Sequence, residues 1–261
     1  MRYALIAVVT VALPALLIAF RSSGQASNQA NRPGSPVLVE LFTSEGCSSC
    51  PPADALLQQL DAAQEGGNPL IVLSEHVDYW NHIGWKDPYS SSFFSRRQSA
   101  YAHRFGLDSV YTPQMVIDGG TQFVGSDSQK AENAIQAARG QSKIPVRVTA
   151  LLVQAPSVLT ARVEAGPSDD AGELELYAAL ALNHAESNVA AGENSGRRLT
   201  HVGVVKALTK IGKVSRGEPF AQDIHLKIDA GADARNLRLI VFAQQPGQGK
   251  ILGSAMQKLD H

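Results

Sequence analysis

The pattern of apolar and polar residues predicts a strand, a helix and a second strand at the start of the folded chain. The apolar run over residues 37–42 is typical of a buried strand. Beyond Gly46, apolar residues recur at the spacing of a helix that ends near Ala63: Ala53, Leu56, Leu57 and Leu60. Residues 70–73 form a short apolar run typical of a strand covered on both faces. This order predicts a parallel pair of strands joined by a right-handed crossover.

Two more helices and a hairpin complete the first half. Aromatic residues at helical intervals over residues 91–105 predict an amphipathic helix. The residues after Pro113 predict a strand that turns at a Gly-Gly pair into a return strand over residues 122–124. Residues 126–128 then cap a helix that ends before Gly140.

The second half has the pattern of strands without helices between them. These strands are expected over residues 146–153, 158–164, 174–182, 220–228, 237–244 and 251–257. Gly, Pro, Asp and Asn separate them, which favours an antiparallel sandwich. We therefore expect two domains. One is an α/β domain over residues 37–140, with a central mixed sheet flanked by helices, and the other is an all-β antiparallel sandwich over residues 144–261.

The amino-terminal 26 residues have the pattern of an export signal. A basic residue, an apolar run over residues 4–20 and small residues before Ser27 predict a signal peptide. The run is also near the lower limit for a membrane span, so an uncleaved anchor in the inner membrane is the alternative. Residues 27–36 are rich in Ser, Asn, Gly and Pro and predict a linker. Either way, we expect the folded part in the periplasm or exported, with no other contact to a membrane.

Composition and charge narrow the function. The chain is 44% hydrophobic and 18% charged, as globular proteins are, and its formal net charge of −1 gives no reason to expect a nucleic-acid partner. It carries no motif of a nucleotide-binding loop, a hydrolase nucleophile elbow or a zinc protease. The two cysteines are the strongest candidates for chemistry.

Cys47 and Cys50 form a CxxC motif at the junction between the first strand and the first helix. Backbone amides and the positive end of the helix dipole stabilise a thiolate there, and can lower a cysteine pKa from about 8.5 to about 3.5–7.5. Cys47 is the expected nucleophile. Cys50, one helical turn further in, would attack a mixed disulfide on Cys47 and release the partner. This mechanism requires a reachable Cys47.

Two other roles for the pair remain open on the residues alone. A structural disulfide in an exported protein has the same spacing. A zinc site has less support, because it needs about four ligands and no second CxxC motif occurs.

Four stretches of the chain carry a family resemblance. LFTSEGCSSCPPADALL, SEHVDYWNHIGWKDPYS, YTPQMVIDG and NVAAGENSGRRLTHVGVVKAL closely resemble the DUF1223 family of exported proteins. The resemblance implies a thioredoxin-like fold for residues 37–140 and a periplasmic thiol-disulfide role. It places Thr112 and Pro113 at the cis-proline position, where the Thr112 backbone would pair with an extended substrate segment. It also implies that the loop over residues 192–201 packs near the dithiol, with Arg197 or His201 reaching the edge that holds Cys47.

The loop that follows the second strand supplies the accessory candidates. It would lie at the same edge of the sheet as Cys47. His76 is the strongest of them, because a histidine near a dithiol can relay a proton between Cys50 and solvent. Further accessory candidates are Glu45, Asp78 and Trp80, although large side chains in such loops often serve only to cover the core.

Three functions fit the sequence. The first is a periplasmic thiol-disulfide oxidoreductase that exchanges with protein thiols and a redox partner and needs no cofactor beyond its own disulfide. Its uncharged Ser48-Ser49 dipeptide favours a reductase or isomerase over a strong oxidant. The second is a carrier of Cu(I), held by Cys47, Cys50 and His76, because thiolates select that ion. The third is a non-catalytic binding module with a permanent disulfide.

Overall fold

The computed structural model describes residues 35–63, 69–154, 157–168, 172–229 and 231–259. The predicted export signal or anchor, and all but the end of the predicted linker, lie outside these residues. Within the described ranges, no helix is both long and apolar enough to span a bilayer.

The first half folds as the sequence pattern predicts. Its elements are β1 (Val37–Thr43), α1 (Pro51–Ala62), β2 (Leu70–His76), the short 3-10 helix η1 (Asn81–Ile83), α2 (Ser92–Phe105), β3 (Gln114–Ile117), β4 (Thr121–Val124) and α3 (Ser128–Arg139). Local signals set the helix boundaries. The Ser91 side chain caps α2 by accepting from the backbone N–H of Phe93, and Asp127 caps α3 by accepting from that of Lys130.

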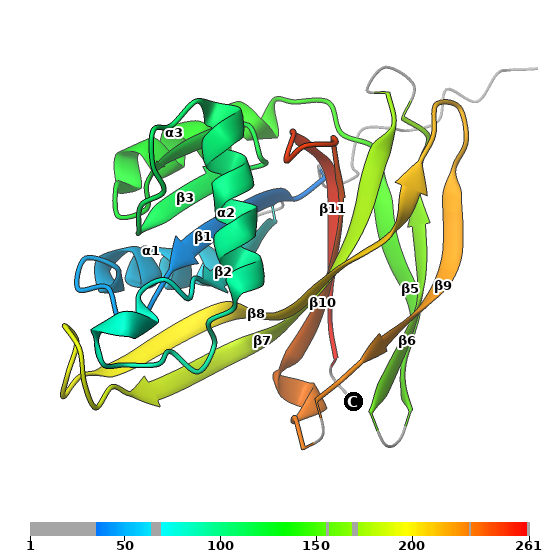
Figure 1. The fold of residues 1–261 in the computed structure, drawn as a ribbon. Coiled ribbons are helices and arrows are strands. Elements are labelled where there is room, and N and C mark those ends of the chain that lie inside the picture. Colours follow the sequence, from blue (N-terminus) through cyan, green and yellow to red (C-terminus); the bar gives the residue numbers. More distant parts are fainter. Residues whose placement is uncertain (1–34, 64–68, 155–156, 169–171, 230, 260–261) are drawn as a thin grey trace, which may run out of the picture. The chain divides into compact units, whose positions relative to one another are not determined.

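Strand β1 lies at the centre of this half (Figure 1). It pairs in parallel with β2 and antiparallel with β3, and β4 pairs with β3. Because side chains alternate along a strand, β1 packs one set against α1 and α3 and the other against α2. This arrangement of sheet and helices is thioredoxin-like.

The second half contains all the predicted strands. They are β5 (Val146–Gln154), β6 (Val158–Ala165), β7 (Leu174–Asn188), β9 (Phe220–Lys227), β10 (Leu237–Gln244) and β11 (Ile251–Lys258), with the short 3-10 helix η2 (Ala234–Asn236) before β10. Strands β5, β6 and β9 form a small antiparallel sheet. This sheet shares one apolar core with β7, β10 and β11, so two sheets are packed face to face as the pattern predicts.

One long strand was missed by the sequence pattern. Strand β8 (Arg198–Val214) pairs along its whole length with β7, which itself continues six residues beyond the predicted end at residue 182. Strand β8 also joins β2 in parallel at Ser74 and Val204. Gly203 allows this approach, because a Cβ there would lie 2.4 Å from the carbonyl oxygen of Val72.

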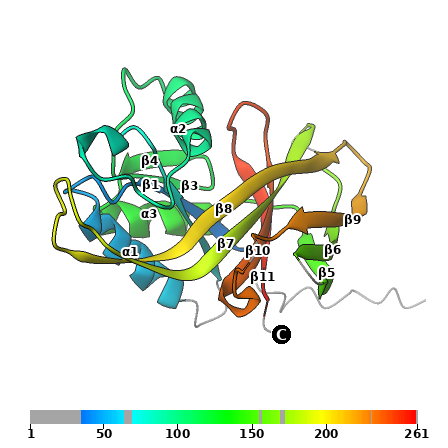
Figure 2. The same cartoon turned by 60° about the horizontal axis from the view of Figure 1, so that its bottom comes forward.

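The β2–β8 pairing makes one eight-stranded sheet of both halves, in the order β11-β10-β7-β8-β2-β1-β3-β4. The strands of the second half therefore extend the sheet of the first half (Figures 1 and 2). The division into domains near residues 140–144 stays a prediction.

Candidate functional site

The CxxC motif occupies the turn between β1 and α1. Cys47 and Cys50 are joined as a disulfide, with their Cα atoms 5.4 Å apart. Cys50 is the N-cap of α1 and does not lie one turn inside the helix, because the helix begins only at Pro51. Pro51 and Pro52 take the first two helical positions, where a missing N–H removes no helical bond.

The loop before β3 lies against this turn. The Thr112–Pro113 peptide bond is cis, the isomer that the family resemblance implies. Ser49 connects the two segments, since its hydroxyl lies 3.3 Å from Cys47 Sγ and 3.5 Å from the carbonyl oxygen of Thr112. Trp80 is also bonded to this loop, because its Nε1 donates to Thr112 Oγ1 at 2.8 Å.

Cys47 is not reachable in this conformation, contrary to the sequence-based expectation. Cys47 and Cys50 are both 0% exposed, although Ser48 and Ser49 between them are exposed. Part of the cover comes from a distant segment of the chain. This segment is residues 189–197, which connect β7 to β8 and which we call the hairpin tip.

The hairpin tip is bonded directly to the CxxC turn. Asn194 is buried and donates from Nδ2 to the carbonyl oxygens of Glu45 and Cys47, at 2.9 and 3.0 Å. Glu193 Oε2 accepts from the backbone N–H of Ser48 at 2.9 Å. Figures 1 and 2 both show the tip beside the segment that leads into α1.

His201 lies buried between two carboxylates that flank the motif in sequence. Its Nε2 is 3.3 Å from Glu45 Oε1, and its Nδ1 is 3.7 Å from Asp54 Oδ1. Burial alone would lower the pKa of His201, but interaction with Asp54 and Glu45 outweighs it and raises that pKa to about 10. His201 is therefore a buried cation at neutral pH. Trp85 completes the cluster by donating from Nε1 to Glu45 Oε2 at 2.8 Å.

His76 lies next to the His201 cluster. Its Nδ1 lies 2.7 Å from Asp87 Oδ2, which also accepts from the backbone N–H of Glu45 at 2.9 Å. Burial would raise the pKa of Asp87, but the charge and hydrogen bond of His76 outweigh it and lower that pKa. The His76 and His201 rings meet edge to face, 4.7 Å apart.

The arrangement needed for the copper hypothesis is not formed. Across the part of the chain that the structure describes, no group of three or more His, Cys, Asp or Glu side chains could hold a metal ion. The sulfurs of Cys47 and Cys50 are bonded to each other, and His76 is engaged with Asp87. Asp78 also turns elsewhere, since it accepts from Ser95 Oγ on α2.

Comparison with known proteins identifies the family. The model of a family of proteins of unknown function, DUF1223, matches residues 38–244. The chain belongs to this family. No functionally curated protein matches the sequence.

Two solved structures share the fold. Protein AGR_C_4864 of Agrobacterium tumefaciens is 24% identical with a TM-score of 0.69, and the match covers 87% of this chain and 95% of that one. HBP35 of Porphyromonas gingivalis is 17% identical with a TM-score of 0.66, over 87% of this chain and 76% of that one. At these identities the likeness extends to the fold alone.

Sequence reasoning missed several residues that build this DUF1223 site. They are Ser49, Asp54, Asp87, Glu193 and Asn194. The polar pair Glu193-Asn194 next to Gly192 indicates a tight turn, but nothing in it predicts a contact with Cys47. The sequence prediction chose Arg197 or His201 from the same loop. Arg197 Nη1 donates to Asn194 Oδ1 at 2.9 Å, so Arg197 reaches the motif only through Asn194.

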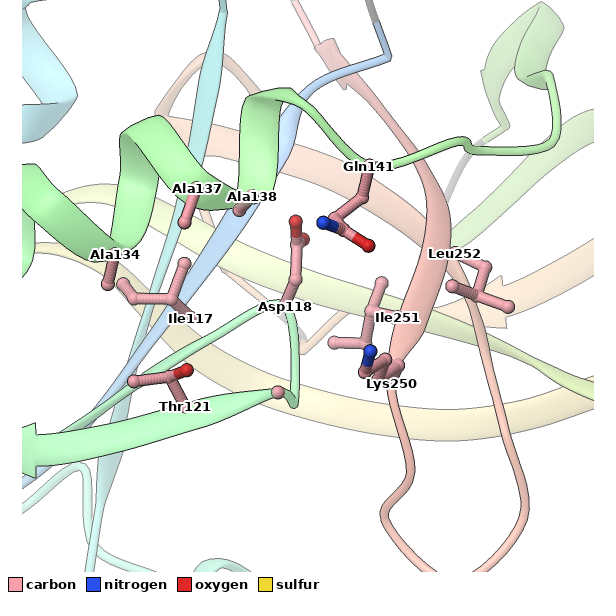
Figure 3. A pocket seen from close by; sticks show the side chains of 11 residues that line it. Ile117, Asp118, Thr121, Ala134, Ala137, Ala138, Gln141, Lys250, Ile251 and Leu252 are labelled. Carbon is pink, nitrogen blue, oxygen red and sulfur yellow. The ribbon is translucent and has the colours of Figure 1, made fainter.

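A separate cavity of about 150 Å³ lies between the β3–β4 turn, α3 and β11 (Figure 3). None of its lining residues belongs to the CxxC turn or to the cis-proline loop. Asp118, at its edge, accepts from the backbone N–H of Leu38 and pairs with Lys143 at 2.7 Å. Its polar side chain is thus engaged by β1 and by the segment that connects the two halves.

Proposed function

We propose that this protein is a thiol-disulfide oxidoreductase of the reductase or isomerase type. One observation carries the proposal. The Cys47–Cys50 disulfide directly precedes α1 and lies, through Ser49, against the Thr112 carbonyl that precedes cis-Pro113. A disulfide at a helix N-terminus favours thiolate formation on reduction, and the neighbouring backbone can align a substrate segment.

The reaction needs only two-electron sulfur chemistry. In the reduced protein, the Cys47 thiolate attacks a substrate disulfide, forms a mixed disulfide and expels one substrate thiolate. The Cys50 thiolate then attacks Cys47 Sγ, expels the second substrate sulfur and leaves the Cys47–Cys50 disulfide. The substrate gains two electrons and takes up two protons as its thiols form. A dithiol donor protein would have to return the two electrons.

The proposed location is the periplasm, because an exported protein with two cysteines can cycle there with dedicated partners. Fractionation of cells that produce the full chain would test this. Recovery of the protein only from the cytoplasm would contradict it, and the mass of the recovered chain would distinguish cleavage before Ser27 from retention of an anchor.

The burial of the disulfide favours a second candidate, a binding module in which Cys47–Cys50 is a permanent staple. Both cysteines are 0% exposed, as inert structural cysteines are. The two candidates differ in reduction potential, because structural disulfides lie below about −300 mV and thioredoxin near −270 mV.

The deciding experiment measures this potential and the catalysis together. The protein is equilibrated in dithiol and disulfide buffers, the thiols are trapped, and reduction of insulin disulfides is followed in parallel. We expect a potential above about −270 mV and catalysis that Cys47→Ser abolishes. Cys50→Ser should instead accumulate mixed disulfides. A potential below about −300 mV without catalysis would establish the staple.

A further inference from the structure

The hairpin tip binds the CxxC turn through the backbone of that turn. Asn194 occupies the carbonyl oxygens of Glu45 and Cys47, and Glu193 occupies the N–H of Ser48. All three groups lie within residues 45–48. They are the kind of groups that an extended polypeptide segment uses when it pairs with a backbone edge.

The tip is well ordered within itself but weakly packed. Arg197 donates to Asn194 Oδ1, and the backbone N–H groups of Val189 and Gly196 are satisfied inside the tip. Only Val189 and Asn194 of the tip are buried. Because little apolar surface holds it down, the tip can lift while the sheets stay folded, with water replacing its three bonds.

We propose that the hairpin tip is a gate, held closed over the disulfide by Glu193 and Asn194, which selects cysteines in extended polypeptide segments. This inference rests on the proposed thiol-disulfide function. A small thiol that attacks Cys47 Sγ must open the gate, which leaves the Glu45 carbonyl and the Ser48 N–H without their partners in the tip and the Cys47 carbonyl with the N–H of Cys50 alone. An extended segment brings its own N–H and C=O groups to replace them. The partner thiolate then bonds to Cys47, and Cys50 leaves as the thiolate.

The test compares a small thiol with a peptide thiol. Oxidised protein is mixed with reduced glutathione, or with an unstructured peptide that carries one cysteine, and disulfide opening is followed by thiol trapping and mass spectrometry. The variants are Asn194→Ala and Glu193→Ala. Ser195→Ala is the matched control, because Ser195 lies in the same tip and its hydroxyl donates to the carbonyl oxygen of Ala190 within it.

We expect Asn194→Ala to speed opening by glutathione about tenfold, the equivalent of ~1.4 kcal/mol, and opening by the peptide by less than about threefold. The wild-type preference for the peptide should shrink accordingly. Forward and reverse rates should rise together with little change in the equilibrium. A mutation that merely weakened the disulfide would shift the equilibrium instead.

Glu193→Ala keeps the proposal testable if Asn194→Ala does not fold, because Glu193 is exposed. It should speed hydrogen exchange at the Ser48 amide and raise the glutathione rate by about threefold. The gate is refuted if both folded variants match Ser195→Ala with glutathione. Should the variants open faster while no form of the protein reduces insulin, the gate survives and the oxidoreductase proposal fails.

Discussion

Two buried ion clusters in this protein differ in how closely their charged groups are hydrogen-bonded. In the first, Arg97 of α2 donates to Glu40 Oε1 of β1 from Nε and Nη2, at 2.8 and 2.5 Å. Tyr101 donates to the other oxygen of Glu40 at 2.6 Å, and Gln244 of β10 accepts from Arg97 at 3.2 Å. The guanidinium also lies over the rings of Tyr101, Tyr177 and Phe242.

In the second cluster, His201 faces Glu45 and Asp54 at 3.3 and 3.7 Å, and neither ring nitrogen makes a close hydrogen bond. Both clusters connect the two halves of the chain. The Arg97 guanidinium is held by several hydrogen bonds and serves stability, because a buried charge is tolerated when it is paired and hydrogen-bonded. Glu75 Oε1 lies 3.5 Å from Arg97 Nε at the edge of this cluster. The His201 cluster, beneath the CxxC turn, makes fewer and longer contacts, yet its two carboxylates still raise the pKa of His201 to about 10.

The largest expected effect is that of Arg97→Met. The variant leaves Glu40 buried without its cation, which costs about 3–5 kcal/mol in the free energy of unfolding. Denaturant unfolding at pH 7 measures it. Arg96→Met is the matched control, because Arg96 is the exposed neighbour on the same helix and should cost less than about 0.5 kcal/mol. Equal losses in the two variants would contradict the assignment.

The sequence predicts the helix that carries Arg97 but not this burial. Phe94, Arg97 and Tyr101 recur at helical spacing, so a core-facing stripe follows from pattern alone. The partners Glu40 and Gln244 lie 57 and 147 residues away and become neighbours only in the folded sheet. A charged residue in an apolar stripe therefore shows where a partner is needed without showing which residue supplies it.

At the candidate site too, the sequence predicts local structure but not partners that lie far away in the chain. The strand, turn and helix around Cys47 are local, and they were predicted correctly except for the start of the helix. Part of the cover over Cys47 comes from Asn194, 147 residues further on, at the end of a hairpin whose strand β8 was missed. Beyond the short apolar run over residues 202–205, much of β8 is polar and exposed, so its full length lacks the pattern that predicts a strand.

His201→Gln should have the next largest effect, about 2 kcal/mol at pH 7, because it leaves Glu45 and Asp54 buried together without a cation. Its pH dependence gives the sharper test. The folded pKa of His201, about 10, exceeds the usual 6.5, so the folded form holds a proton that the unfolded form releases between these values. The contribution is complete below pH 6.5 and is lost as pH rises towards 10.

Wild-type unfolding free energy should therefore fall over this range, and His201→Gln should lack that part of the fall. Chemical unfolding from pH 6 to pH 10, with the cysteines kept oxidised, measures both. Parallel curves for the two proteins would show that His201 is not a cation in the folded state.

Glu75→Gln tests a neighbour of the Arg97 cluster and should have a smaller effect on stability. Burial raises the pKa of Glu75 well above its usual value, against the charge of Arg97, and Glu40 raises it further. Folding thus keeps a proton on Glu75 that the unfolded chain releases above about pH 4.5. The variant cannot ionise, so its stability relative to wild type should improve as pH rises from 5 to 8. A constant difference would mean that Glu75 is ionised in the folded protein.

The smallest expected effect comes from an exposed pair that shares the chemistry of the Arg97 cluster but not its burial. Arg162 and Asp223 lie 3.2 Å apart on the small sheet, with side chains 38% and 62% exposed. Water and salt screen such a pair, so Arg162→Gln should cost at most about 0.5 kcal/mol, and less in 1 M salt. A loss above about 1 kcal/mol would mean that burial is not what separates these pairs.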